Sequence, residues 1–361
     1  MLKNIHIWLP AYLARSIPRD AAPPTHVFFC FVDHYEPLWL GASPDKGLER
    51  VRQWRSQYPK LADRFRDADG RPPQHTFFYP AEEYRLELLN EISALCAAGY
   101  GEVEIHLHHD NDTADNLRRT LEDFKNKLRS HGHLTTDRDG NTRYGFIHGN
   151  WCLDNSRRDG RWCGVNNELQ VLRETGCYAD FTLPSAPSEC QTRKINSIYY
   201  ATDDPKKPRS HDTGADVRVG TQASGDLLLV QGPLALNWHD RKFGLLPRIE
   251  NADVAWHSPA THARIDNWVR QRIGVQGRPD WVFVKVHTHG CQEKNFHVTF
   301  GPSATAMHEY LQHTYNNGRK FVLHYVTARE VFNLVKAAEA GKDGPPGQFR
   351  DFLLPPPPVK R

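Results

Sequence analysis

The chain has 361 residues, of which 39% are hydrophobic and 25% charged, and 46 Lys and Arg against 43 Asp and Glu give a net charge of +3. These figures are typical of one large or two smaller globular domains, and they exclude a small disulfide-stapled module and a disordered chain. So small a net charge provides no basic surface for nucleic acid, which we exclude as a partner. The unusual figure is 20 histidines against 2 methionines.

The seven cysteines are odd in number and include no C-x-x-C pair, which predicts reduced thiols in a cytoplasmic protein. No stretch approaches the ~20 apolar residues of a membrane span, and the N-terminus lacks the apolar run of a secretory signal. Residues 1–19 place apolar side chains at helical spacing beside basic ones. Membrane contact through this segment is one hypothesis, but packing on the protein's own flank is favoured. Pro10 is expected to interrupt the helix.

Short β-branched and aromatic runs alternate with longer amphipathic stretches along most of the chain, which predicts repeated strand–helix units. The predicted strands are 26–32, 74–79, 102–108, 144–150, 178–183, 227–231, 281–287 and 320–326. The predicted helices are 47–66, 81–98, 113–130, 166–175, 260–273, 303–316 and 328–340.

Seven or eight such units favour an irregular (β/α) barrel over a doubly wound sheet, because no glycine-rich dinucleotide loop follows the first strand. We therefore predict an N-terminal segment over 1–24 and a barrel domain over 25–342. The irregular stretch around 185–260 is interpreted as an insertion into this barrel. The proline-rich tail over 343–361 is expected to be extended and solvated.

Histidine, aspartate and asparagine side chains follow the apolar runs of four predicted strands. They are Asp33 and His34 after the first strand, His106, His108, His109 and Asp110 after the third, His148 and Asn150 after the fourth, and His287 and His289 after the seventh. In a βα barrel, active sites are assembled at the rim formed by the C-terminal ends of the strands. The sequence therefore predicts one functional site at this rim.

The cluster after the third strand has the composition of a metal site. If the extended conformation continues, the side chains of His106, His108 and Asp110 share one face, whereas that of His109 points away. Imidazoles and a carboxylate that lie close together can hold a metal ion and leave a coordination position open for water. We therefore expect a divalent metal here.

Two further strand ends could supply proton transfer. Asp33 stands at the mouth of the barrel, where an aspartate can act as a metal ligand or as a general base. His287 and His289 share one face, and one of them is the candidate general acid, because imidazole can protonate a leaving group near neutral pH. The alternative is that both histidines only orient other side chains.

Other polar residues near the strand ends carry weaker signals. His148, Asn150 and Trp151 could line a sugar-binding wall, because an aromatic face and an amide suit a polyhydroxylated ring. Asp112 is interpreted as the N-cap of the helix that follows it. Glu82 opens a helix after the second strand, where the helix dipole alone explains an acidic residue.

These motifs resemble those of the polysaccharide deacetylases, carbohydrate esterase family four, whose fold is an irregular βα barrel. Phe-Val-Asp-His at 31–34 stands where the family has Thr-Phe-Asp-Asp, and His-Leu-His-His-Asp at 106–110 stands where it has His-Ser/Thr-x-x-His. The resemblance implies a general base at Asp33, metal ligands at His34, His106 and Asp110, and a general acid at His287 or the nearby His289.

The chain departs from the family's motifs in ways that exchange residue types. His34 replaces the aspartate of one metal-binding motif and Asp110 replaces a histidine of the other, so two imidazoles and one carboxylate remain, which suits a divalent metal such as zinc. A register two residues later would choose His108 and Asp112 instead. The family's Arg-x-Pro motif, which orients the base, is replaced by His-Gly-Asn-Trp at 148–151.

The resemblance implies a metal-dependent hydrolase that removes an acyl group, in particular N-acetyl, from an amino sugar or polysaccharide precursor. Without an export signal, a cytoplasmic or lipid-linked sugar is the expected substrate. One alternative is a glycoside hydrolase, which would use two carboxylates about 5 to 9 Å apart, such as Asp33 and Asp180. Another is a non-catalytic glycan-binding or assembly protein with a degenerate site.

Overall fold

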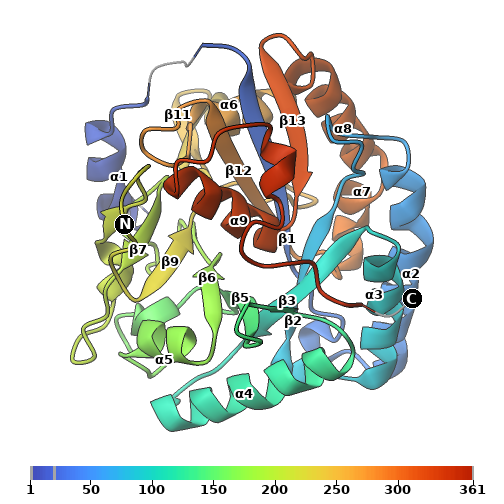
Figure 1. Cartoon of the computed structure of the whole chain (residues 1–361), viewed down its shortest axis with the longest axis vertical. Coiled ribbons are helices and arrows are strands. Elements are labelled where there is room, and N and C mark those ends of the chain that lie inside the picture. The colour runs from blue at the N-terminus through green and yellow to red at the C-terminus, as the bar shows by residue number, and fades with distance from the viewer. Residues whose placement is uncertain (1–2, 19–21, 360–361) are drawn as a thin grey trace.

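The computed structural model describes residues 3–18 and 22–359, which form a mixed α/β fold around a large, mostly parallel sheet (Figure 1). The strands of this sheet are β1 (Thr25–His34), β2 (His75–Pro80), β3 (Gly101–Leu107), β4 (Thr135–Thr136), β5 (Thr142–His148), β6 (Cys177–Asp180), β7 (Ile198–Ala201), β8 (Ala215–Asp216), β9 (Leu227–Val230), β12 (Trp281–Thr288) and β13 (Phe321–Val326). A separate antiparallel pair consists of β10 (Ala235–Lys242) and β11 (Leu246–Glu250).

The helices lie mainly around the outside of the sheet. They are α1 (Ile5–Ala14), α2 (Pro44–Ala62), α3 (Leu86–Ala97), α4 (Ala114–Ser130), α5 (Glu168–Glu174), α6 (His262–Arg270), α7 (Phe296–Thr299), α8 (Pro302–Tyr315) and α9 (Ala328–Glu339). Every predicted strand and helix has a counterpart in the structure, with boundaries shifted by a few residues. Five strands were not predicted: β4, and β7, β8, β10 and β11, which fall within the stretch interpreted as an insertion.

The strands follow the order β12-β1-β2-β3-β5-β6-β9-β7-β8. β13 pairs with the first half of β1 and β2 with its last residues, so these two strands share one edge of β1 while β12 occupies the other. All neighbours from β12 to β9 run parallel, whereas β7 and β8 are antiparallel additions. Within the described residues this path does not return from β8 to β12, so backbone pairing does not close the sheet into a ring.

Side-chain alternation divides the strands between two apolar cores. On β1, Phe28, Cys30 and Val32 contribute to a core that is also formed by α9, and we call this the inner face. Phe29 and Phe31 contribute to the other core, which includes residues of the surrounding helices, and we call this the outer face. Because alternation continues to the strand ends, it also decides which polar side chains at the rim share a face.

Helix α1 packs on the flank of the protein, as favoured from the sequence. Trp8 is buried in a small apolar cluster with residues of the predicted insertion. The helix runs through Pro10, contrary to the predicted interruption, because burial of the apolar face stabilises it despite the lost backbone donor. Leu2 and Arg19, which the hypothesis also covered, lie outside the described residues. No helix of the described chain has the length and apolar character needed to cross a membrane.

Residues 346–354 of the C-terminal tail dock on the domain, contrary to the predicted solvated end, whereas Pro355, Pro356 and Pro358 are exposed as predicted. The buried Arg350 guanidinium donates hydrogen bonds to Asp67 Oδ2 at 2.8 Å, to Glu330 Oε2 at 2.9 Å and to the Tyr325 carbonyl oxygen at 2.7 Å. Leu354 is buried in the inner core. One charged and one apolar side chain therefore dock a segment whose composition suggested a free end.

Replacing Arg350 with alanine should lower the free energy of unfolding by about 3–5 kcal/mol, because Asp67 and Glu330 would keep their buried charge without this partner. Urea denaturation of both proteins measures the difference. The control is Arg55→Ala, whose guanidinium is 56% exposed and pairs with Glu91; its expected cost is below about 1 kcal/mol. Equal costs for the two variants would contradict the structural role of the tail.

Candidate active site

Side chains from the ends of β1, β3 and β12 meet around one buried carboxylate, that of Glu36. Its Oε1 lies 3.5 Å from His106 Nε2 and 3.2 Å from His108 Nε2, and its Oε2 lies 3.0 Å from His289 Nδ1. The ring centroid of His34 is 4.8 Å from that of His106 and 4.7 Å from that of His289. We call His34, Glu36, His106, His108 and His289 the rim cluster.

The alternation of the strands explains why these residues meet. His34 ends β1 on its inner face, and the amide of Tyr35 still donates to the carbonyl oxygen of Phe78, which keeps the chain extended up to Glu36. His106 and His108 are related by the same two-residue step. The rim cluster is therefore the continuation of the inner face beyond the last paired residues.

The charges of the rim cluster stabilise one another. Burial opposes ionisation of Glu36, but the adjacent imidazoles of His106, His108 and His289 outweigh it and hold the pKa of Glu36 well below its usual range. Burial likewise disfavours a charged His108, yet the carboxylates of Glu36 and Glu82 raise its pKa to about 10. For His34, burial and then the neighbouring His289 lower the pKa far below its usual value. The cluster thus combines neutral and cationic imidazoles.

The donor atoms of the rim cluster fit a metal ion. Glu36, His106 and His108 each place one potential ligand atom within 4.8 Å of the other two. His106 Nδ1 lies 3.0 Å from the carbonyl oxygen of Ile147. If Nδ1 carries the proton and donates it to this oxygen, the lone pair of Nε2 is free to bind a metal ion on the side of Glu36. Among the described residues, His34 Nδ1 and His106 Nε2 are buried without a hydrogen-bond partner. Such atoms are ligands that a divalent cation can take.

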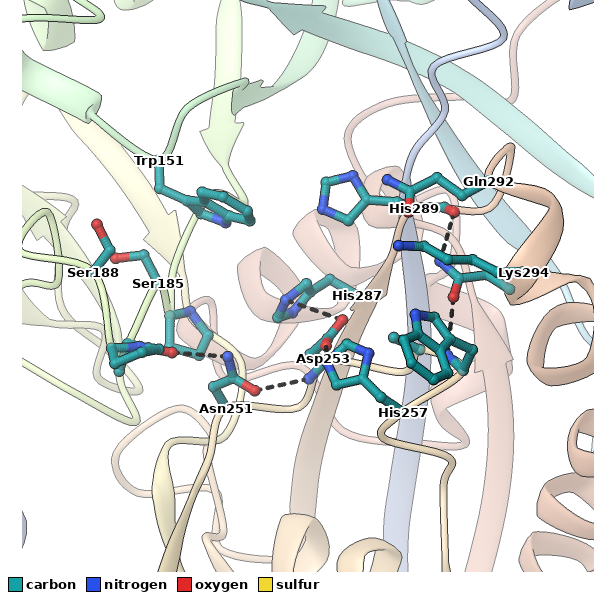
Figure 2. Close-up of a pocket in the computed structure, with 16 residues that line it drawn as sticks. Trp151, Ser185, Ser188, Asn251, Asp253, His257, His287, His289, Gln292 and Lys294 are labelled. Atoms are coloured by element: carbon teal, nitrogen blue, oxygen red, sulfur yellow. Dashed lines mark hydrogen bonds and ion pairs between the residues drawn. The ribbon is translucent and has the colours of Figure 1, made fainter. Parts of the chain in front are cut away.

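A cavity of about 330 Å³ lies beside the rim cluster (Figure 2). Its walls include Trp151, Asp253, Trp256, His287 and His289. The volume is in the range of small-ligand sites, and indole rings with a few polar groups suit the flat apolar faces and hydroxyl groups of a sugar. The ring of Trp151 also lies within 5.8 Å of the ring of His289, so the cavity and the cluster share a wall.

Asp253 reaches the cavity from the predicted insertion. The segment around it pairs with the end of β12, because the amide of Val254 donates to the His287 carbonyl oxygen at 2.8 Å and the amide of His287 donates to the Ala252 carbonyl oxygen at 3.1 Å. This pairing places Asp253 Oδ1 3.9 Å from His287 Nε2. Burial raises the pKa of Asp253 and lowers that of His287 well below its usual value.

Asp33, predicted as the general base, lies on the outer face of β1 and away from the cavity walls. Its Oδ1 accepts a hydrogen bond from the amide of Gly290 at 2.6 Å, and its Oδ2 lies 3.5 Å from His75 Nδ1. Alternation explains the difference, because Asp33 and His34 are consecutive and must point to opposite faces. Asp33 therefore holds the loop that carries His289 and supplies no base to the cavity.

Asp110, predicted as a metal ligand, is exposed and accepts a hydrogen bond from the amide of Trp162. The chain leaves the extended conformation after Leu107, so the expected two-residue step from His108 to Asp110 does not hold. Asp112 does not provide a ligand to the rim cluster either. It was predicted to be the N-cap of α4, but the N-cap is Thr113. The carboxylate that lies beside His106 and His108 is that of Glu36, which neither sequence register named.

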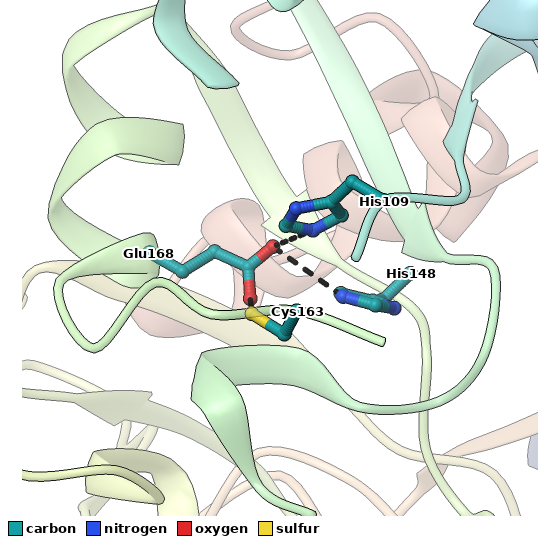
Figure 3. Close-up of side chains that lie close together, drawn as sticks. All are labelled: His109, His148, Cys163 and Glu168. Carbon is teal, nitrogen blue, oxygen red and sulfur yellow. Dashed lines mark hydrogen bonds and ion pairs between the residues drawn. The ribbon is translucent and has the colours of Figure 1, made fainter. Parts of the chain in front are cut away.

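The three residues of the predicted sugar-binding wall do not lie together. Trp151 lines the cavity, whereas His148 is buried on the outer face of β5, near His109 and Glu168 (Figure 3). Asn150 is not among the residues that line the cavity in the described part of the chain. One of the three predicted wall residues therefore stands at the site.

Asp33 and Asp180, the carboxylate pair named for the glycoside hydrolase alternative, do not meet at the cavity. Asp180 is buried in β6, where its carboxylate accepts hydrogen bonds from the amide and hydroxyl of Thr182. Neither Asp180 nor Asp33 lines the cavity within the described residues.

Sequence reasoning missed several functional candidates. Glu36 could have been found, because it lies two residues after His34 and alternation places both on one face. Glu82 contacts His108 Nδ1 directly, beyond any effect of the helix dipole. No local signal identified Asp253, which comes from an irregular segment.

Comparisons with known proteins give no family for this chain. No protein-family model matches it, and no curated protein matches it either. The resemblance to the polysaccharide deacetylases therefore rests on the order and position of the motifs and stays a prediction.

Variants of the rim cluster should bind divalent cations more weakly. We expect Glu36→Gln and His106→Ala to weaken the binding of Zn²⁺ to this site at least about tenfold, because each removes a donor atom from a small set. Calorimetric titration of metal-free protein with Zn²⁺ measures the change. Asp110→Asn is the control and should bind as the wild type does. Unchanged Zn²⁺ affinity in Glu36→Gln and His106→Ala would contradict the assignment.

Proposed function

We propose that this protein is a metal-dependent hydrolase that removes an acyl group, in particular N-acetyl, from an amino sugar or glycan precursor. The observation that carries the proposal is the rim cluster, whose buried imidazoles and carboxylate adjoin a cavity with two indole walls. The motif resemblance to polysaccharide deacetylases supports the same reaction.

His34, Glu36, His106 and His108 are the residues that would hold the cation. When bound there, a divalent metal such as Zn²⁺ would polarise the amide carbonyl and lower the pKa of a water molecule. The hydrogen bond from His106 to the Ile147 carbonyl oxygen and the contact of His108 with Glu82 orient two of these imidazoles.

We assign the proton transfers to side chains that face the cavity. Asp253 takes the role of general base that the resemblance implied for Asp33, and the adjacent His287 orients it. His289, which Glu36 holds through Nδ1, donates a proton to the nitrogen of the departing amine. Asp253 accepts one proton of the attacking water, the water oxygen bonds to the acyl carbon, the amide C–N bond breaks, and acetate and a free amine leave.

We also propose that the sheet is an open form of the irregular (β/α) barrel of seven or eight strands that the resemblance implies. Lys285, on the inner face of β12, supports this interpretation because its Nζ donates to the Phe181 and Leu183 carbonyl oxygens, just beyond β6. The amide of Gly232, just after β9, also donates to the Leu183 carbonyl oxygen at 3.0 Å. The Lys285 contacts bridge the gap between β12 and the β6–β9 side without strand pairing, and the Gly232 contact holds the segments after β6 and β9 together.

The protein should release acetate from N-acetylated amino sugars, and a chelator should abolish this activity until Zn²⁺ is restored. We expect Asp253→Asn to lower kcat at least about 100-fold, because it removes the base but leaves the side-chain shape. Asp110→Asn should keep wild-type activity. Acetate release is followed with a coupled assay over a panel of N-acetylated mono- and oligosaccharides.

Three outcomes would count against the proposal. Release that persists in chelator would exclude a role for the metal. Reducing ends formed without acetate would favour a glycoside hydrolase, and sugar binding without any turnover would favour a glycan-binding protein.

A further inference from the structure

A second group of ligand-type side chains lies on the outer face of the sheet (Figure 3). His109 follows β3, His148 ends β5, Cys163 lies in the loop after β5, and Glu168 begins α5. One potential ligand atom from each residue lies within 4.8 Å of those of the other three. We call these four residues the outer-face group.

The carboxylate of Glu168 lies from each of the other three members at a distance close to that between two ligands of one tetrahedral ion. Glu168 Oε1 lies 3.1 Å from His109 Nε2 and 3.8 Å from His148 Nε2, and Glu168 Oε2 lies 3.4 Å from Cys163 Sγ. Nitrogen, oxygen and sulfur ligands at about 2.0–2.3 Å from zinc, at tetrahedral angles, are about 3.3–3.8 Å from one another. The side chains are thus already spaced as ligands of a common centre.

His148 is the strongest single indication of a missing partner. It is fully buried, and neither of its ring nitrogens has a hydrogen-bond partner among the described residues. Burying an imidazole without hydrogen bonds costs free energy, because its ring nitrogens lose their hydrogen bonds to water and form none with the protein. Coordination of Nε2 beside Glu168 would satisfy one of these atoms.

The surroundings of the group orient its ligand atoms. Asp112 Oδ2 lies 3.1 Å from His109 Nδ1, which leaves His109 Nε2 directed at Glu168. Cys163 Sγ accepts hydrogen bonds from the amides of Asn155 at 3.3 Å and Val165 at 3.5 Å. A carboxylate behind an imidazole and amide donors to a sulfur are the contacts that support metal ligands.

We propose that His109, His148, Cys163 and Glu168 form a closed, structural zinc site. Two imidazoles, a thiolate and a carboxylate favour zinc over magnesium or calcium, which prefer oxygen ligands. Four protein ligands leave no position for water or substrate, so this site stabilises the fold and performs no chemistry. It ties the loop at 149–167, which carries Trp151, to the ends of β3 and β5.

Cobalt substitution separates this site from the rim cluster. A thiolate bound to Co²⁺ gives an intense charge-transfer band in the near ultraviolet, and the rim cluster contains no thiol. We expect the band in Co²⁺-loaded wild type and its loss in Cys163→Ser. It should persist in Cys177→Ser, which removes another buried thiol, and in His106→Ala, which alters the rim cluster alone. Elemental analysis should find one zinc ion fewer in Cys163→Ser than in the wild type.

Two results would overturn the proposal. One is a cobalt-loaded wild type without the thiolate band, and the other is an unchanged zinc content in Cys163→Ser. X-ray absorption of the zinc-loaded wild type needs no variant and should show a sulfur ligand at about 2.3 Å; a shell of nitrogen and oxygen alone would also overturn it. Because the band is read in His106→Ala as well, a failure of the proposed hydrolase site leaves this result intact.

Discussion

The buried carboxylate of Glu36 sets the geometry of the candidate site. An ionised carboxylate out of water costs several kcal/mol unless charged or hydrogen-bonding partners surround it. Those partners are His106 and His108 from the end of β3 and His289 from beyond β12, so three strands must end at one rim. Parallel pairing of β12, β1, β2 and β3 provides this common rim, and the same cluster then supplies donor atoms for a cation.

Most of the fold was predictable because its signal is local. Apolar runs bounded by polar residues located the parallel strands, and amphipathic periods located the helices between them. The docking of the tail was not predicted, because composition cannot show that Arg350 meets the buried carboxylate of Asp67, 283 residues earlier in the chain. His109 is also distant in the sequence from Cys163, as His287 is from Asp253, so no local pattern predicted these contacts.

The candidate site was predictable in position but only partly in membership. The predicted strand ends placed His34, His106, His287 and His289 at one rim, and the structure has them there. The assignments failed where the two-residue period was not applied, as for Asp33, or where the chain had already turned, as for Asp110. Neighbouring residues can therefore belong to different sites: His108 belongs to the rim cluster, whereas His109 belongs to the outer-face group.

Asp33, on the outer face of β1, helps to position the loop that carries His289 although it does not line the cavity. Its carboxylate holds the amide of Gly290, and the indole of Trp54 donates to the carbonyl oxygen of the same residue at 2.9 Å. A Cβ at position 290 would lie 2.0 Å from Asp33 Oδ2, so glycine alone permits this approach. The loop is thereby fixed directly after His289, whose ring faces the cavity. The inner face thus carries the proposed reacting groups, and the outer face determines their positions. Asp33 keeps the place of the motif aspartate at the end of β1, but its role is to position the loop and not to act as a general base.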